Sequence, residues 1–230
     1  MFILNNEIKN IIFDLDGTIS DPQLGITKSI NYALNKMGEQ SRELSALIKY
    51  IGPPLEDTFI ELLETKDEVT LNRAVEYFRE RYISKGFMEN ELYEGIEDIL
   101  QLLSEKGCQC FIATGKRIDV ARDVVKYFKL NKYFKKVYGS DGGVSKVELL
   151  KILISENSLD SSETVMVGDR KFDIESGKEN GLKTIGVLWG YGTIEELKRC
   201  EPDLMFETVI EMKEFLVEPT KNIEDNWMRE

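Results

Sequence analysis

Residues 11–18 read Ile-Ile-Phe-Asp-Leu-Asp-Gly-Thr, and this stretch decides the fold. The apolar run 11–13 is typical of a strand that is buried on both faces, as in a parallel sheet. Asp14 and Asp16 follow where the run ends, and two carboxylates this close resist ionising together. A bound cation, or a reaction that uses one of the acids, would account for the pair. The alternative is an ordinary turn, because Asp and Gly are common turn residues.

The composition is ordinary for a soluble globular protein with a sizeable core. The 230 residues are 42% hydrophobic and 31% charged. A formal net charge of −12 argues against a nucleic-acid polymer or an anionic membrane as partner, but it allows a small anionic substrate at a local positive site. No apolar stretch approaches the roughly 20 residues of a membrane span. The first residues lack the basic start of a secretory signal, so we expect a cytoplasmic protein.

Histidine and cysteine usage narrows the possible chemistry. The chain has no histidine, which removes the usual general base of Ser and Cys hydrolases and a frequent zinc ligand. Catalysis would therefore depend on carboxylates, lysines, hydroxyl groups and a hard metal ion. The three cysteines, Cys108, Cys110 and Cys200, match neither a disulfide framework nor a familiar metal spacing. Cys108 and Cys110 alternate along a predicted strand and are interpreted as core thiols.

From residue 95 onward the hydrophobic pattern alternates between helices and strands. Strands are predicted near residues 108–113, 137–138, 164–167, 183–188 and 204–206. Helices are predicted near 95–106, 117–130, 146–157, 172–180, from 193, and at 209–216. Such alternation with short connections predicts an α/β fold, a parallel sheet with helices on both faces. Ligands of such sheets bind at the carboxyl ends of the strands.

Residues 22–94 follow a different pattern. Helices are predicted at 26–37, 44–50, 55–63 and 69–85, with no strand between them. We infer a helical domain of residues 22–94 inserted into a sheet domain of residues 1–21 and 95–216, followed by a polar tail of residues 217–230. Gly52-Pro53-Pro54 joins two of these helices. This stiff loop either reaches into a cleft or simply ends a helix.

Two features at predicted strand ends are suited to binding phosphate. Thr114 and Gly115 lie between a strand and a helix, where a hydroxyl and free backbone N–H groups can hold anion oxygens. An ordinary helix cap is the alternative for Thr114. Lys146 opens a helix against the macrodipole, which is mildly unfavourable unless an anion lies nearby. A solvated surface lysine is the alternative there.

A second acid pair ends another strand. Asp169 follows the apolar run 165–167 and Gly168, and Asp173 lies four residues on, at the start of the next helix. One such acid is commonly a helix cap. Together with Asp14 and Asp16, however, the pair supplies the oxygen ligands that Mg²⁺ prefers.

The chain resembles the haloacid dehalogenase-like hydrolase superfamily in four motifs that occur in the same order: Asp14-Leu-Asp16-Gly-Thr18, Thr114, Lys146 and Gly168-Asp169-Arg-Lys-Phe-Asp173. Segments 25–28, 51–55 and 186–192 are similar to the branch of phosphoglycolate phosphatases and 5′-nucleotidases. The resemblance implies a Rossmann-like parallel-sheet core domain with an inserted α-helical cap domain.

The resemblance also implies roles for the acids. Asp14 would be the nucleophile and form an aspartyl-phosphate. Asp16 would protonate the leaving oxygen and then activate water. Mg²⁺ would be held by the side chains of Asp14 and Asp169 and by the backbone carbonyl of Asp16. Asp173 would orient the metal ligands or Lys146.

Thr114, Gly115 and Lys146 would bind the transferring phosphoryl group by the same resemblance. The chain departs from it in two places. Residues 113–116 read Ala-Thr-Gly-Lys where these relatives usually have Thr-Ser-Lys-Pro, although Gly115 still offers its N–H. The segment before Lys146 is shortened, which leaves Lys151 as an alternative for the motif lysine.

These features predict a Mg²⁺-dependent phosphatase that acts on a small phosphorylated metabolite of the phosphoglycolate or nucleoside monophosphate type. A phosphosugar mutase of the β-phosphoglucomutase type is a second possibility, although the absence of a cap histidine argues against it. A non-catalytic binding module on the same fold is a third. We expect no nucleic-acid or membrane partner and a monomer or weak homodimer.

Overall fold

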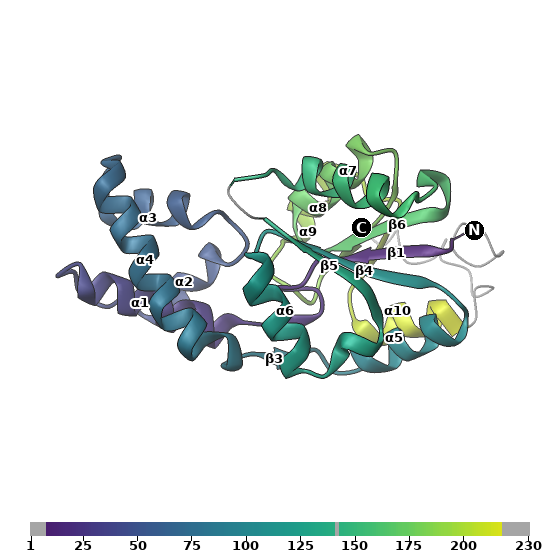
Figure 1. Ribbon diagram of the computed structural model, residues 1–230, viewed down its shortest axis with the longest axis horizontal. Helices are drawn as coiled ribbons and strands as arrows, with labels where there is room; N and C mark the ends of the chain where they lie inside the picture. The colour runs from purple at the N-terminus through teal and green to yellow at the C-terminus, as the bar shows by residue number, and fades with distance from the viewer. Residues whose placement is uncertain (1–7, 141–142, 218–230) are drawn as a thin grey trace.

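The structure is a computed structural model that describes residues 8–140 and 143–217. Within these residues six strands form a parallel sheet in the order β5-β4-β1-β6-β7-β8 (Figure 1). The strands are β1 (Asn10–Phe13), β4 (Gln109–Thr114), β5 (Phe134–Gly139), β6 (Thr164–Gly168), β7 (Lys183–Val187) and β8 (Leu204–Phe206). The predicted α/β fold is confirmed. The predicted polar tail lies outside the described residues except for residue 217.

Helices cover both faces of the sheet (Figure 1). One face packs against α5 (Ile96–Glu105), α6 (Ile118–Tyr127) and α10 (Val209–Val217). The other face packs against α7 (Lys146–Asn157) and α8 (Lys171–Glu179), and α9 (Ile194–Cys200) lies beside α8. Along β1, Ile11 and Phe13 join the first cluster and Ile12 the second. This alternation follows from the two-residue period of a strand.

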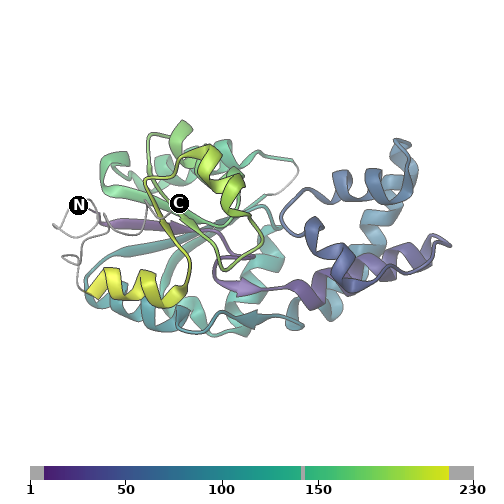
Figure 2. The same cartoon turned by 180° about the vertical axis from the view of Figure 1, so that it is seen from behind.

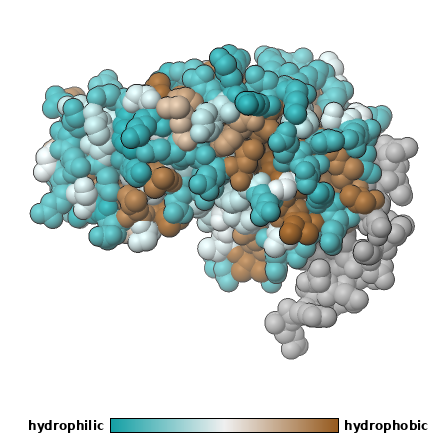
Figure 3. Space-filling view, turned by 90° about the horizontal axis from the view of Figure 1, so that it is seen from below, coloured by the Kyte–Doolittle hydropathy of each residue, from teal (hydrophilic) through white to brown (hydrophobic). Residues whose placement is uncertain are grey.

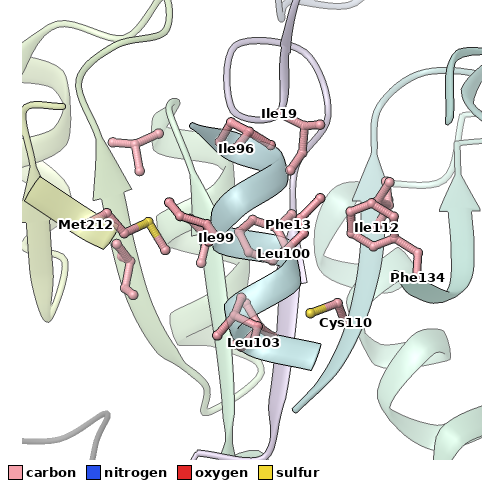
Figure 4. Close-up of a cluster of buried hydrophobic side chains, with 14 of the residues drawn as sticks. Phe13, Ile19, Ile96, Ile99, Leu100, Leu103, Cys110, Ile112, Phe134 and Met212 are labelled. Atoms are coloured by element: carbon pink, nitrogen blue, oxygen red, sulfur yellow. The ribbon is translucent and has the colours of Figure 1, made fainter. Parts of the chain in front are cut away.

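Helix α5 shows how the sequence produces this packing (Figure 4). Ile96, Ile99, Leu100 and Leu103 lie at helical spacing, face the sheet and are almost completely buried. Burial of each side chain contributes about 1.5–3 kcal/mol. Cys110 points into the same cluster, so its interpretation as a core thiol is confirmed. Cys108 packs against the cluster, and all three cysteines are free.

The helices of residues 22–94 extend from one end of the sheet (Figures 1 and 2). They are α1 (Gln23–Lys36), α2 (Leu44–Leu47), α3 (Leu55–Leu63) and α4 (Glu68–Ser84), with 3₁₀ turns at Ile48–Tyr50 and Gly86–Met88. Their apolar side chains form a hydrophobic cluster that includes Ile30, Leu34, Phe59 and Phe78. This segment therefore has a core largely of its own.

Residues 22–94 contain one short strand that the sequence pattern missed, after the last of the predicted helices. β3 (Glu91–Leu92) pairs antiparallel with β2 (Ser20–Asp21). Two-residue strands are too short to produce a detectable alternation of apolar and polar residues, which is why the pattern missed them. Because β2 and β3 lie at the two joints of the helical segment, their pairing ties both joints together.

The face in Figure 3 is mostly hydrophilic, with small separate hydrophobic areas. Among the described residues, no helix has both the length and the apolar character needed to cross a membrane.

Candidate active site

The three central strands bring the predicted residues to one edge of the sheet. The parallel register aligns Phe13 with Ile112 of β4 and with Val167 of β6. Asp14, Thr114 and Asp169 all lie within two residues beyond these positions, so they share the carboxyl edge. Asp14 continues the side of Ile12, which faces α7.

Lys146, the first residue of α7, lies between two acids of this edge. Its Nζ is 2.8 Å from Asp14 Oδ1 and also forms an ion pair with Asp173. Asp14, Asp169 and Asp173 each place a carboxylate oxygen within 4.8 Å of the others. Lys151, the alternative motif lysine, is exposed on the same helix. The structure thus brings Lys146, rather than Lys151, to the acids.

The acids outnumber the positive charge beside them. Burial, with the charges of Asp173 and Asp14, raises the pKa of Asp169 to about 8. Burial also raises the pKa of Asp173 to about 6, although Lys146 opposes the rise. Burial disfavours the charge of Lys146, but Asp14 and Asp173 outweigh it and raise the pKa of the lysine. One lysine therefore leaves three buried carboxylates short of compensating charge.

Hydrogen bonds and close packing hold the Asp169 side chain in one orientation. Thr18 Oγ1 donates to its Oδ1 at 3.2 Å, and the backbone N–H of Tyr191 donates to its Oδ2 at 2.8 Å. Gly17 passes so close that a Cβ there would lie 2.3 Å from Asp169 Oδ2, and its φ of +85° also favours glycine. These contacts orient a carboxylate that is fully buried.

Asp173 is held at the start of α8. Its Oδ2 accepts a hydrogen bond from the backbone N–H of Arg170 at 2.9 Å, as in a capping box, while Oδ1 faces Lys146. A Cβ on Gly168 would lie 2.1 Å from Asp173 Cγ, so glycine at the end of β6 makes room for this side chain. Asp173 therefore takes part in the capping box of α8, whose N-cap residue is Arg170, and also lies in the acid cluster.

The donor set fits a hard divalent cation. The clustered atoms are carboxylate oxygens, which Mg²⁺ prefers. The raised pKa values of Asp169 and Asp173 show that the cluster lacks positive charge when no metal is bound. A cation at this point would relieve the repulsion among the acids.

Thr114 ends β4 and is buried. Its Oγ1 accepts a hydrogen bond from the backbone N–H of Lys116 at 3.3 Å. The N-cap residue of α6 is Arg117, so Thr114 is not the cap of that helix. A Cβ on Gly115 would meet nothing within 4 Å, which leaves open space beside the loop at the carboxyl edge.

Asp16 has a partner that the sequence did not predict. Lys116 Nζ lies 2.8 Å from Asp16 Oδ2 and donates to Tyr82 Oη of α4 at 2.8 Å. The second oxygen, Asp16 Oδ1, is buried without a hydrogen-bond partner among the described residues. Burial raises the pKa of Asp16, Lys116 lowers it, and Asp14 raises it further, with a net rise. Lys116 ends the 113–116 segment compared with the relatives above, but neither its contact with Asp16 nor a tyrosine from the helical segment was predicted.

Two further contacts join distant segments near the site. Arg170 Nη1 donates to the backbone carbonyl of Ile51 at 2.7 Å, and its Nε donates to Glu196 Oε1 at 2.9 Å. The backbone just before Gly52-Pro53-Pro54 therefore contacts Arg170 at the start of α8, while the role of the loop itself stays a prediction. Trp189 Nε1 donates to the backbone carbonyl of Thr18 at 3.0 Å and ties the 186–192 segment to the first motif.

Comparison with known proteins identifies the family. The model of the haloacid dehalogenase-like hydrolases matches residues 11–187. The chain belongs to this family. A curated member, a 5′-nucleotidase of Pseudomonas aeruginosa, is 37% identical over 196 residues, covering 84% of this chain and 88% of the relative. The pyrophosphatase PpaX of Anoxybacillus flavithermus is 32% identical over 212 residues, covering 91% and 97%.

The solved structure of a predicted phosphatase from Clostridium acetobutylicum superimposes on this one with a TM-score of 0.85. It is 35% identical and the match covers 91% of this chain and 98% of that chain. The predicted family, fold and class of enzyme, a haloacid dehalogenase-like phosphatase, are confirmed by these similarities.

Proposed function

We propose that this phosphatase depends on Mg²⁺ and hydrolyses a small phosphate monoester through an aspartyl-phosphate on Asp14. The observation that carries the proposal is the placement of Asp14, with Lys146 Nζ 2.8 Å from its Oδ1, within a cluster of three buried carboxylates. Phosphoryl transfer depends mainly on positioning and charge neutralisation, and this arrangement offers both.

The side chains of Asp14 and Asp169, with the backbone carbonyl of Asp16, would hold the Mg²⁺ ion. Asp173 would orient Lys146, its ion-pair partner. When bound, the ion would neutralise the acids and the oxygens of the phosphoryl group.

Residues of the protein would carry out the nucleophilic attack, the proton transfers and the binding of the phosphoryl group. A carboxylate oxygen of Asp14 attacks phosphorus, and the bond from phosphorus to the ester oxygen breaks. Asp16 gives its proton to that oxygen, then takes a proton from the water that attacks the aspartyl-phosphate, which restores Asp14 and releases phosphate. Lys146, Thr114 and the N–H of Gly115 bind the phosphoryl oxygens. The raised pKa of Asp16 supports its role as the acid.

The substrate is proposed only as a class, phosphoglycolate or a nucleoside monophosphate. The named relatives are a 5′-nucleotidase and a pyrophosphatase, which act on different phosphate compounds. We propose that residues 22–94 act as a cap over a core of residues 1–21 and 95–216 and select the substrate. Support comes from the separate hydrophobic cluster of the helices. The cytoplasmic location and the monomer or weak homodimer remain predictions.

The test is hydrolysis of p-nitrophenyl phosphate with Mg²⁺ by wild type and by Asp14→Asn. We expect activity that disappears with EDTA, returns with added Mg²⁺, and is lost in the variant by at least about 10⁴-fold, as expected for removal of a nucleophile. Retained activity in Asp14→Asn would refute the assignment. Isomerised sugar phosphate in place of free phosphate would favour a mutase, and no turnover of any phosphometabolite would favour a binding module.

A further inference from the structure

We propose that Lys116 and Tyr82 are positioning residues for Asp16, and that Tyr82 makes the orientation of this acid depend on contact with the helical segment. The inference rests on the proposed function, because it concerns the acid–base step of that reaction. It gives roles to Lys116, which follows the predicted phosphate-binding residues Thr114 and Gly115, and to Tyr82 of the helical segment, neither of which was predicted to act on Asp16.

The two acids of the first motif have separate lysines. Lys146 Nζ lies 2.8 Å from Asp14 Oδ1, and Lys116 Nζ lies 2.8 Å from Asp16 Oδ2. An ammonium group has three donors and no acceptor. Lys116 directs its charge to one oxygen of Asp16 and donates another hydrogen bond to Tyr82 Oη at 2.8 Å. Its position is therefore defined by partners on two sides.

Tyr82 is a rigid partner that belongs to the helical segment. It lies on α4, is only 4% exposed, and stacks on Phe78 with ring centroids 5.4 Å apart. Phe78 is part of the hydrophobic cluster formed by these helices. The Lys116 ammonium also lies over the Tyr82 ring, 4.4 Å from its centroid, which adds a cation–π contact. Lys116 itself follows β4 of the sheet, so the contact links the two parts of the chain.

The two carboxylate oxygens of Asp16 have different surroundings. Lys116 holds Oδ2, while Oδ1 is buried with no hydrogen-bond partner among the described residues. A buried polar atom of this kind usually has a partner, which here would be the ester oxygen of the substrate. Oδ1 is thus the oxygen that gives and takes the proton. Loss of the Tyr82 contact would free Lys116 and allow the Asp16 carboxylate to rotate away from that pose.

A different result is expected if Lys116 and Asp16 form only a buried ion pair that stabilises the fold. A pair that only stabilises the fold would affect all substrates alike when it is weakened. A pair that positions the acid affects the substrates that need the acid. Nitrophenolate leaves without a proton, whereas an alkoxide needs one, so general acid catalysis contributes mainly to alkyl esters.

The experiment compares kcat on p-nitrophenyl phosphate with kcat on alkyl monophosphates, namely phosphoglycolate, AMP and glycerol 3-phosphate. Tyr82→Phe keeps the ring and loses one hydroxyl group. We expect its kcat on the hydrolysed alkyl esters to fall about tenfold, and on p-nitrophenyl phosphate by less than about twofold. Lys116→Met should lower the alkyl rate about 100-fold, and Lys116→Arg should recover part of it.

Two matched variants serve as controls. Tyr77→Phe changes another tyrosine of α4, and Lys126→Met removes an exposed lysine of α6; both should keep the wild-type ratio of the two rates. Unfolding midpoints identify any variant that fails to fold. If Lys116→Met fails to fold, Tyr82→Phe still tests the inference. Equal decreases in kcat on p-nitrophenyl phosphate and on the alkyl esters, or an unchanged kcat in Tyr82→Phe, would overturn the inference. Activity in Asp14→Asn would contradict the proposed function instead.

Discussion

Replacement of Lys146 by methionine probes the electrostatic balance of the site. The substitution keeps most of the side-chain length and removes the ammonium that pairs with Asp14 and Asp173. The Lys146 side chain is 14% exposed and that of Asp173 is 1% exposed, so the pairs are largely shielded from water. Breaking a buried pair by removing one partner typically costs about 3–5 kcal/mol. We expect the low end, about 3 kcal/mol, because the remaining acids can take up protons.

The same substitution should affect catalysis separately from stability. Lys146 is proposed to bind the phosphoryl oxygens, and removal of one such preorganised group lowers kcat by about 10²–10³-fold. Stability is measured by urea unfolding of the metal-free protein at pH 7. Activity is measured on p-nitrophenyl phosphate with saturating Mg²⁺, at a temperature where the variant remains folded.

Lys151→Met is the matched control, because Lys151 is exposed on the same helix and is the alternative motif lysine. It should change the free energy of unfolding by no more than about 0.5 kcal/mol and leave kcat unchanged. Loss of activity in Lys151→Met with retention in Lys146→Met would refute the reasoning. So would a Lys146→Met protein with wild-type stability and wild-type kcat.

Two further predictions concern the acid cluster. In the metal-free folded protein the pKa values of Asp169 and Asp173 are raised to about 8 and about 6, above the 3.8 of a free side chain. The folded state therefore holds these protons more tightly than the unfolded state. The stability that they contribute is present at low pH and is lost as the pH rises through those values. Mg²⁺ should therefore raise the free energy of unfolding more at pH 8.5 than at pH 5.5. At 100 times the dissociation constant measured at pH 8.5, the increase at that pH should be about 2.7 kcal/mol, and it should vanish in Asp169→Asn. An equal increase at both pH values would contradict the prediction. Gly168→Ala places a methyl group 2.1 Å from Asp173 Cγ and should cost about 1–3 kcal/mol in urea unfolding while lowering kcat. Unfolding and turnover like those of wild type would show that Asp173 moves without consequence.

The sequence predicts the part of the site that depends on strand ends. Asp14, Thr114 and Asp169 each follow an apolar run, and parallel pairing brings such positions to one edge without further information. These three residues follow from local patterns together with one rule of topology. Lys146 was indicated by its place at a helix start and by the family resemblance, and only the structure separates it from Lys151.

The contacts that sequence could not predict join segments with no common pattern. Tyr82 and Lys116 form a hydrogen bond although they are 34 positions apart in the sequence. Arg170 and the carbonyl of Ile51 do so at a separation of 119 positions. Both depend on how the helical segment packs against the sheet edge, which hydrophobic periodicity does not determine. The two-residue strand β3 was missed for a related reason, since its pairing with β2 depends on the return of the chain rather than on its own residues.

The most direct test of the central claim is to identify the covalent intermediate. The wild-type protein, mixed with Mg²⁺ and p-nitrophenyl phosphate, is quenched in acid within one turnover and reduced with borohydride, which converts an acyl phosphate of aspartate to homoserine. Peptide mass spectrometry should find homoserine at position 14 and unmodified aspartate at positions 16, 169 and 173. Turnover with no modification at Asp14, or modification at another acid, would contradict the account.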